Sequence, residues 1–392
     1  VCHVASRWIN LRKNTPLKRF NEEFFLKMLI HQLAKRRKRS AQKSVLICAK
    51  DFGGCKQMPA QEKKRAKLID VARHAGVSPG TVSNALHNTR FVEPETRRRI
   101  EEAIVALNYT PNIRARQLRT GKTNTIALLS SVPLTIASGA SRLGFMMEVA
   151  LTSAMMALEK QHALILVPPG ANPLDAVGFD AAILIEPAEN DPQLQALAQA
   201  GIPCVTIGRT PGTDTPVPWV ELHSAATAQI LLAHLADSGA RKCALFVGNT
   251  RRTSTLETEA AYQRWCEGRQ SPVVYSLNES DGENAGYRAA HQLLQEHPDV
   301  DGVLVLIDTF ASGAVRAFQE QGIAIPDHMR VVTRYDGIRA RESTPPLTAV
   351  NMHLDEVARQ AITLLFAVLA GEKVSYSKGK APDLVVRTST SR

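Results

Sequence analysis

The chain has 392 residues, a hydrophobic fraction of 44% and a formal net charge of +11, so it is long enough for two or three folded domains. No apolar run approaches the ~18 residues that cross a bilayer, and the six scattered cysteines form no C-x-x-C pair. This composition excludes a membrane-spanning protein, argues against a disulfide framework or structural zinc, and suits the reducing cytoplasm.

Charge is unevenly distributed along the chain. Residues 1–124 carry 27 Lys and Arg against 9 Asp and Glu, a balance of +18, whereas the remainder has a balance of −7. A basic N-terminal portion ahead of a mildly acidic body is expected where one end of a protein meets a polyanion such as nucleic acid. Solvated basic tails produce the same asymmetry, so the charge alone is compatible with either interpretation.

Residues 1–57 carry a basic block, Lys35–Arg39, that follows apolar residues at helical spacing. The segment could be an amphipathic helix that touches a membrane or DNA, or a disordered extension. It could also lie outside the native product, because the chain begins with Val1 and Met58 stands shortly before the first structured motif. We expect residues 1–57 to be a disordered or non-native extension, with Met58 as the working start. A cleavable signal peptide is not expected, because its basic residues would precede the apolar stretch.

The strongest local pattern is KLIDVARHAGVSPGTVSNALHN, at residues 67–88. Small and aliphatic residues follow one side of a first short helix, and Gly76 then permits a tight turn. Ser78 is a strong N-cap, and Pro79 suits the first helical position because its missing N–H needs no partner there. The second helix, Pro79–Leu86, presents only short polar groups on its outer face. Two such helices joined by a glycine turn predict a helix-turn-helix, whose second helix enters the major groove.

A third helix is predicted after Glu93-Pro94, with Ile100, Ile104 and Leu107 on its buried side. The sequence Asn108–Pro111 ends it, so the expected DNA-binding domain covers residues 66–111. A short basic segment follows at residues 112–124 and is compatible with a linker.

The run DVARHAGVSPGTVSNAL…VEPETRRRIEEAIVALNYTPNIRARQLRTGKTNTIALL resembles the N-terminal signature of the LacI/GalR family of bacterial transcription regulators, and a weaker likeness continues to about Glu372. The resemblance implies an all-α helix-turn-helix head, followed by a hinge helix and linker at residues 112–124, of which Ile113–Thr120 becomes helical only on operator DNA. It also implies that Leu118 wedges into the minor groove at the centre of a palindromic site. The protein is then expected to be a sequence-specific regulator, a homodimeric repressor controlled by a small molecule, in the cytoplasm on nucleoid DNA.

The same resemblance assigns the DNA contacts. Pro79, Gly80 and Asn84 occupy base-choosing positions, and Asn84 stands where the commonest pattern has an arginine. Asparagine suits adenine, whereas arginine favours guanine. Thr81, Ser83 and further polar side chains are expected to hold phosphates and so fix register. The full expected DNA-binding set is Ser78, Pro79, Gly80, Thr81, Ser83, Asn84, Asn88, Tyr109, Arg114, Arg116 and Leu118.

From Thr125 onward, short apolar runs alternate with helical stretches, which predicts parallel sheets covered by helices on both faces. The expected strands are Ile126–Ser130, Leu164–Val167, Ala181–Ile185, Cys204–Ile207, Ala244–Val247, Val303–Leu306 and Arg330–Thr333. The expected helices include Leu143–Lys160, Ala225–Asp237, Asn284–Glu296 and Ser312–Gln321. About 250 residues in this pattern suit two α/β lobes. The resemblance implies a periplasmic-binding-protein-like domain over residues 125–392, which pairs the chains and holds an effector between its lobes.

The expected effector site departs from the family pattern. Thr258 stands where sugar-binding relatives often carry an arginine, and Ile307 replaces an asparagine before Asp308. Asp336 is retained where the family has a cleft aspartate, and Arg209 follows a strand end. The expected effector-binding residues are therefore Arg209, Thr258, Asp308 and Asp336. The loss of two polar anchors makes a neutral sugar doubtful, so the ligand is expected to be a sugar-related or anionic metabolite, or the pocket has lost its use.

Other classes of protein are less compatible with the sequence. We expect no enzyme, no cofactor and no metal site, because G-x-S-x-G, the phosphate loop, H-E-x-x-H and G-x-G-x-x-G are missing from the sequence. A solute-binding protein would share the two-lobed body but would lack the DNA-binding head. An activator or dual regulator remains the alternative, because the position of the operator relative to the promoter decides that role.

Overall fold

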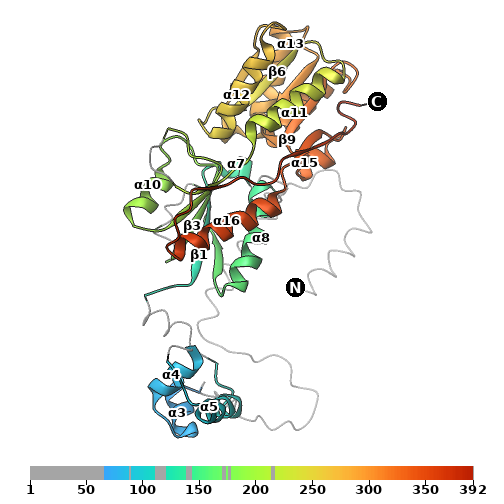
Figure 1. Cartoon of the computed structure of the whole chain (residues 1–392). Helices are drawn as coiled ribbons and strands as arrows, with labels where there is room; N and C mark the ends of the chain where they lie inside the picture. Colours follow the sequence, from blue (N-terminus) through green and yellow to red (C-terminus); the bar gives the residue numbers. More distant parts are fainter. Residues whose placement is uncertain are drawn as a thin grey trace, which may run out of the picture. The chain divides into compact units, whose positions relative to one another are not determined.

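The computed structural model describes residues 66–87, 90–110, 121–137, 144–169, 174, 178–212 and 217–391. The chain divides into two units, residues 1–110 and 111–392, which are described separately (Figure 1). The expected N-terminal extension, Asn88 of the expected DNA-binding domain, and most of the expected hinge, including Arg114, Arg116 and Leu118, lie outside the described residues. Within the described part of the chain, no helix is long and apolar enough to cross a membrane.

The head consists of three short helices, α3 (Leu68–Ala75), α4 (Pro79–His87) and α5 (Pro94–Ala106). Gly76 ends α3 with a left-handed φ of 66°, as the turn requires. The Thr81 N–H donates to Ser78 Oγ at 3.1 Å, which confirms the predicted N-cap. The helices bury a common apolar core of Val71, Ala72, Ala75, Val82, Ala85, Val92, Ile100, Ala103 and Tyr109.

The body contains two six-stranded sheets, one in each lobe. The first sheet has, in spatial order, β11 (Tyr376–Ser377), β5 (Trp219–Val220), β4 (Cys204–Ile207), β3 (Ala181–Ile185), β1 (Thr125–Ser130) and β2 (Ala163–Leu166). The second has β12 (Asp383–Val385), β10 (Thr348–Asn351), β9 (Arg330–Tyr335), β8 (Gly302–Val305), β6 (Cys243–Gly248) and β7 (Val274–Leu277). Among these strands only the β10–β12 pair is antiparallel. The predicted two-lobed α/β class with parallel sheets is confirmed.

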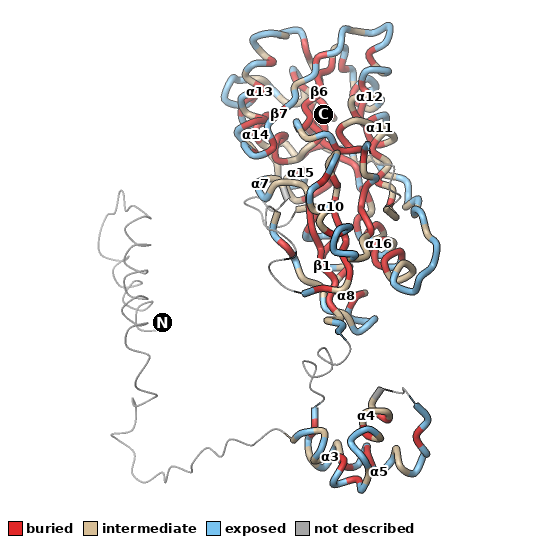
Figure 2. The backbone as a smooth tube through the Cα atoms, turned by 90° about the vertical axis from the view of Figure 1, so that its left-hand side faces the viewer, coloured by how far each residue is buried: buried red, intermediate tan, exposed pale blue. Residues whose placement is uncertain are grey.

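Helices cover both faces of each sheet, as Figures 1 and 2 show. Their bounds are α7 Leu134–Ala137, α8 Phe145–Glu159, α10 Pro192–Gln199, α11 Ser224–Asp237, α12 Thr253–Cys266, η1 Glu279–Asp281, α13 Glu283–Glu296, α14 Asp308–Glu320, α15 Ile338–Glu342 and α16 Leu354–Leu369. Alternate residues of β1 enter opposite cores, because strand side chains alternate. Ile126 and Leu128 share a core with α8 and α16, whereas Ala127 and Leu129 pack with Leu197 of α10.

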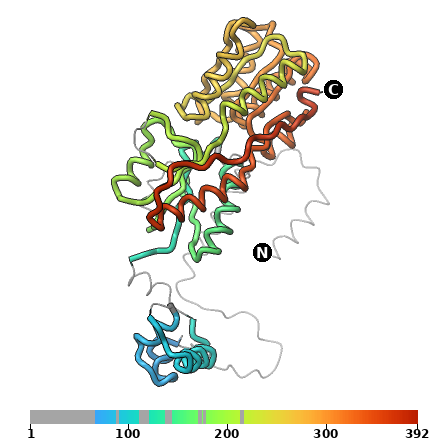
Figure 3. Tube along the Cα trace, in the orientation of Figure 1, coloured from blue at the N-terminus to red at the C-terminus, as the bar shows by residue number. Residues whose placement is uncertain are grey.

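The chain passes between the lobes from β5 to α11, from β10 to α16 and from β11 to β12 (Figure 3). The first two passages have the same local design. His223 and His353 each precede a helix at a left-handed φ of 52°, and their N–H groups donate to Glu221 Oε1 and Asn351 Oδ1. Both imidazoles then contact the third passage, His223 at the carbonyl of Lys378 and His353 at the carboxylate of Asp383. These contacts tie the three connections together.

Candidate functional site

The outer surface of α4 is built from short side chains. Val82 and Ala85 are buried in the head core, at 0% and 7% exposure, so the opposite side of the helix faces outward. Ser78, Pro79 and Gly80 are exposed there, and Thr81 and Asn84 are half-buried. A Cβ atom at Gly80 would meet only Ser78 Oγ, at 3.6 Å, so packing within the head does not require a glycine. The surface therefore allows a close approach of the backbone to an external partner such as a DNA groove.

Tyr109 occupies a different position from the other expected DNA contacts. It is 8% exposed and belongs to the head core, and burial raises the pKa of its hydroxyl. Its backbone N–H donates to Ile104 O at 2.9 Å, which closes the end of α5. The structure thus gives Tyr109 a packing role, and its contact with phosphate stays a prediction.

A cavity of about 70 Å³ lies between the lobes, where the carboxyl ends of β1, β3, β8 and β9 meet. Ligands of open α/β sheets bind at such strand ends. Most of the lining is apolar, with a few convergent polar groups, as in small-molecule sites. The lining residues are Ser130, Val132, Ile136, Gly144, Phe145, Met146, Ile185, Glu186, Leu306, Ile307, Asp308, Arg334 and Tyr335.

Carboxylates dominate the polar part of this cavity. Burial raises the pKa of Asp308 at the start of α14, and the nearest cation is Arg339, whose Nε lies 3.8 Å from Oδ2. Burial also acts to raise the pKa of Glu186, but the charge and hydrogen bond of Arg334, 2.5 Å away, outweigh it and hold that pKa below its usual value. Tyr335 stacks edge-on against Phe145, with ring centroids 5.6 Å apart.

The four expected effector residues are placed differently. Asp308 lines the cavity, and Arg209 lies at a smaller adjoining pocket, where its guanidinium pairs with Glu257 at 3.2 Å. Thr258 is 1% exposed on α12 and does not line the cavity. Asp336 stands outside the lining as well, because Arg387, at 2.6 Å, and Arg341, at 3.3 Å, hold its carboxylate. The structure therefore brings Asp308 and Arg209 to the same seam. Thr258 is buried on α12 and Asp336 is paired with two arginines, and the effector contacts of all four residues stay a prediction.

The sequence reasoning missed the charged residues that dominate this seam, Glu186, Arg252, Glu279 and Arg334. Glu186 directly follows a buried strand, and Arg252 comes shortly after another. A charged side chain next to the carboxyl end of a parallel strand is a recognisable signal of a cleft residue. Their pairing could not be read from the sequence, since Glu186 and Arg334 are 148 positions apart.

Replacing the cavity carboxyl by Asp308→Asn is expected to raise the melting temperature of the body by a few degrees at pH 7. Because the pKa of Asp308 is higher in the folded chain than its ordinary value of 3.8, the penalty for burying its charge is absent at low pH. The penalty grows as the pH rises through the folded-state pKa. Thermal unfolding from pH 3.5 to pH 8 should show a gain only at the higher pH values, and an equal gain at all pH values would contradict this origin.

Two family models match the chain. Residues 67–112 match "Bacterial regulatory proteins, lacI family", and residues 232–390 match "Periplasmic binding protein-like domain". Among curated relatives, the HTH-type transcriptional regulator CelR of Thermobifida fusca is 28% identical over 332 residues, covering 80% of this chain and 94% of CelR. The HTH-type transcriptional repressor PurR of Haemophilus influenzae is 25% identical over 341 residues, covering 83% of this chain and 98% of PurR.

Solved structures show the same architecture. The complex of the regulator CelR with cellobiose has a TM-score of 0.60 at 25% identity, and covers 83% of this chain and all of that chain. The lac repressor dimer bound to operator and the anti-inducer ONPF has a TM-score of 0.69 at 22% identity, covering 83% of this chain and 99% of the repressor chain. The second likeness shows the fold alone.

A helix-turn-helix head followed by a two-lobed periplasmic-binding-protein-like body defines a DNA-binding transcription regulator with an effector-binding domain. The chain is similar to LacI-family regulators, with a LacI-type helix-turn-helix domain ahead of a periplasmic-binding-protein-like domain. The family resemblance of the sequence is thereby confirmed. The relatives named above are transcription regulators and not enzymes.

Proposed function

We propose that the protein is a repressor that binds a palindromic operator as a homodimer and releases or holds it according to a small molecule between the lobes. The observation that carries this proposal is the outer surface of α4, where short polar groups project from a capped helix that the head core fixes in place. The repressor role is supported by PurR, which is named as a repressor. The protein then acts in the cytoplasm, on nucleoid DNA. An activator would need the same surface, so the operator position decides between the two.

An exposed apolar stripe on α8 supports the homodimer. Met147, Leu151, Met155 and Leu158 are 37%, 67%, 62% and 73% exposed. They follow one another at intervals of four, four and three residues, so they share one side of the helix. Contiguous exposed apolar surface of this kind marks an interaction site. A second copy of the chain is the proposed occupant, because the two-fold symmetry of a homodimer matches the proposed palindromic operator.

The change Asn84→Ala is expected to remove the preference for one base pair in each half-site and to weaken binding to the selected operator about tenfold. The reason is that an asparagine amide can hydrogen-bond adenine at two atoms, whereas alanine cannot. Fluorescence anisotropy with the selected operator and with single-base variants measures both effects. Thr96→Ala on α5 is the control. If the Asn84 variant shows an unchanged base preference, Asn84 does not read the operator.

The proposed effector site is the interlobe cavity with Asp308. The cellobiose in the CelR complex belongs to that protein. In the cavity of this chain Arg334 pairs with Glu186 and Arg339 lies near Asp308, so the charge of the lining alone does not select the class of ligand. A panel of sugars, organic acids and amines can be screened by thermal shift, because a ligand that binds only the folded chain raises its melting temperature. A ligand of this site should lose most of its effect with Asp308→Asn. A ligand that stabilises both chains equally binds elsewhere.

The hinge assignment of residues 112–124 stays a proposal that rests on the family resemblance. In it, Leu118 wedges into the minor groove, and Arg114 and Arg116 contact the DNA backbone. The phosphate contacts of Ser83 and Asn88 are also proposals that rest on the family resemblance.

A further inference from the structure

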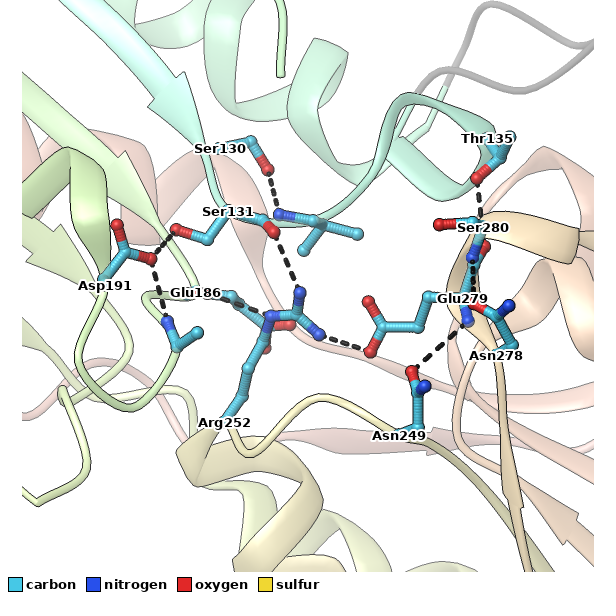
Figure 4. A network of polar contacts seen from close by, with 12 residues as sticks. Ser130, Ser131, Thr135, Glu186, Asp191, Asn249, Arg252, Asn278, Glu279 and Ser280 are labelled. Carbon is cyan, nitrogen blue, oxygen red and sulfur yellow. Dashed lines mark hydrogen bonds and ion pairs between the residues drawn. The ribbon is translucent and has the colours of Figure 1, made fainter. Parts of the chain in front are cut away.

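Arg252 lies at the seam between the two lobes and bonds to both of them. It follows β6 of the second lobe, and its side chain is only 4% exposed. Its Nε donates to the carbonyl of Glu186 at 3.1 Å, and a terminal nitrogen donates to the carbonyl of Ser131 at 2.9 Å, both in the first lobe. Its other terminal nitrogen pairs with Glu279 Oε1 of the second lobe at 2.5 Å (Figure 4).

Both sides of this contact are organised to receive a guanidinium group. In the first lobe, Ser131 and Glu186 directly follow the neighbouring strands β1 and β3, so their carbonyls lie side by side. Ser131 Oγ donates to Asp191, whose other carboxylate oxygen caps α10 by accepting from Gln193 N at 2.9 Å. The carbonyl of Ser131 is therefore attached to a rigid framework rather than to a loose loop (Figure 4).

In the second lobe, the carboxylate of Glu279 fills a buried space that is free because Gly248 has no side chain. Glu279 is 1% exposed at the start of η1, and a Cβ atom at Gly248 would collide with its carboxyl group. Asn249 Oδ1 accepts from the backbone N–H of Glu279 at 3.5 Å, and the hydroxyl of Thr135 on α7 donates to the carbonyl of Glu279 at 3.0 Å. A buried carboxylate without a partner is strongly destabilising, so Glu279 needs a cation beside it. Arg252 is that cation.

Two neighbouring ion pairs across the seam are of a different kind, whereas Arg334 and Glu186 form a buried pair across it, as Arg252 does. Arg251 pairs with Glu189 at 2.7 Å and Arg209 pairs with Glu257 at 3.2 Å, but the two arginine side chains are 63% and 54% exposed. Exposed pairs contribute little because water and salt screen them, whereas the buried, charge-assisted hydrogen bonds of Arg252 are among the strong ones. Arg251 and Arg252 are adjacent in sequence, but Arg251 forms an exposed ion pair and Arg252 a buried one. Arg251 is therefore a suitable control for Arg252.

We propose that Arg252 is an internal latch that holds the two lobes closed without an effector. Its guanidinium bonds to the carbonyls that follow β1 and β3, and it lines a small pocket that shares Glu186 with the interlobe cavity. The lobe arrangement of the free chain is then held by Arg252 together with the buried pair of Arg334 and Glu186, and an effector acts by displacing the Arg252 contact rather than by supplying closure. The regulatory consequence rests on the proposed function, because a ligand shifts the equilibrium only through its different affinity for the closed and open states.

Hydrogen exchange of the full chain tests the latch directly. The Glu189 N–H donates to Arg251 O at 2.8 Å across the seam, so its exchange reports separation of the lobes, whereas the Leu245 N–H, bonded to Val273 O at 2.9 Å, reports on the second lobe alone. The variant Arg252→Met with Glu279→Gln removes both buried charges and keeps similar side-chain volumes. We expect Glu189 to exchange at least about tenfold faster in this variant, with Leu245 unchanged, because two charge-assisted hydrogen bonds between the lobes are lost.

The control is Arg251→Ala, which removes the exposed pair but keeps the carbonyl that accepts from Glu189. It should change the exchange of Glu189 less than about twofold, as expected for an exposed ion pair. Small-angle X-ray scattering should show a larger radius of gyration for the double variant alone. The latch is refuted if the double variant exchanges at the wild-type rate, or if Arg251→Ala opens the seam to the same extent.

The single variant Arg252→Ala leaves Glu279 buried without a partner and is expected to unfold more easily, which is why the double variant carries the test. Operator binding of the wild-type chain is measured on the same samples. A wild-type chain that binds no DNA would refute the proposed function and leave the exchange result standing. An intact operator complex with an unchanged seam in the double variant would refute the latch alone.

Discussion

Leu151→Glu combined with Leu158→Glu is expected to turn the dimer into a monomer and to weaken operator binding at least about hundredfold. These side chains are 67% and 73% exposed, so they contribute little to the fold of one chain. In the proposed dimer they lie within an apolar interface, where each unpaired carboxylate costs about 2–5 kcal/mol. A single head then meets only one half of a palindromic operator and loses the benefit of two linked sites. Sedimentation velocity and fluorescence anisotropy measure the two effects.

The control for this prediction is Gln195→Glu with Gln199→Glu. These positions lie on α10, which covers the sheet face opposite to α8, and they add two carboxylates to the same lobe. The control chain should remain dimeric and bind operator within about threefold of wild type, since only the general charge of the lobe has changed. A dimeric Leu151/Leu158 variant with full operator affinity would show that the chains pair through a different surface.

Gly313→Ala is expected to destabilise the body by at least about 3 kcal/mol, beyond the usual cost of overpacking. Gly313 lies on α14, and a Cβ atom there would collide with the carbonyl of Glu283 and lie 2.7 Å from the backbone nitrogen of Tyr287, both on α13. Gly286 of α13 is similarly close to the carbonyl of Phe310. The two helices therefore meet backbone to backbone, and neither side can yield as a flexible side chain would.

Urea unfolding followed by circular dichroism measures this loss, with Gln292→Ala on α13 as the control. Gln292 is exposed, and its amide contacts only Glu296 among the hydrogen bonds described for it, so this variant should unfold close to the wild-type midpoint. A Gly313→Ala chain as stable as the control would mean that α13 and α14 can separate without loss of the core.

The head and the strands could be predicted because their signals are local. Gly76, Ser78 and Pro79 lie within four positions, and each residue type has a specific role in a turn or a cap. The body strands are short apolar runs, and all seven that were predicted overlap strands of the structure. Such features depend on neighbouring residues and need no knowledge of distant contacts.

The interlobe seam could not be predicted in the same way. Asp336 looks like a cleft aspartate from its place after β9, but Arg387, far along the chain, takes up its carboxylate. Arg252 and Glu279 are separated by 27 positions, and nothing in their immediate surroundings indicates a buried pair. Tyr109 resembles a polar surface residue at a helix end, yet the three helices of the head enclose it. Each of these outcomes depends on which elements the fold brings together.

The exposed apolar stripe of α8 is another feature that the sequence alone does not predict. Methionines and leucines occur on every side of this helix, a composition that normally indicates burial all round. One chain buries only the side with Met146, Val149, Ala150, Ser153 and Ala157. The remaining apolar side makes sense if a second chain covers it, and this partner is not visible in the periodicity of one sequence.

The most direct test of the DNA-binding account is selection of bound fragments from a random DNA pool by the full chain. We expect enrichment of a single palindromic motif, with two copies of one half-site at a fixed spacing, because two heads of a symmetric dimer read it. The base preference in each half-site should relax with Asn84→Ala and persist with Thr96→Ala. A pool that yields no motif, or one without two-fold symmetry, would contradict a homodimeric operator-binding regulator.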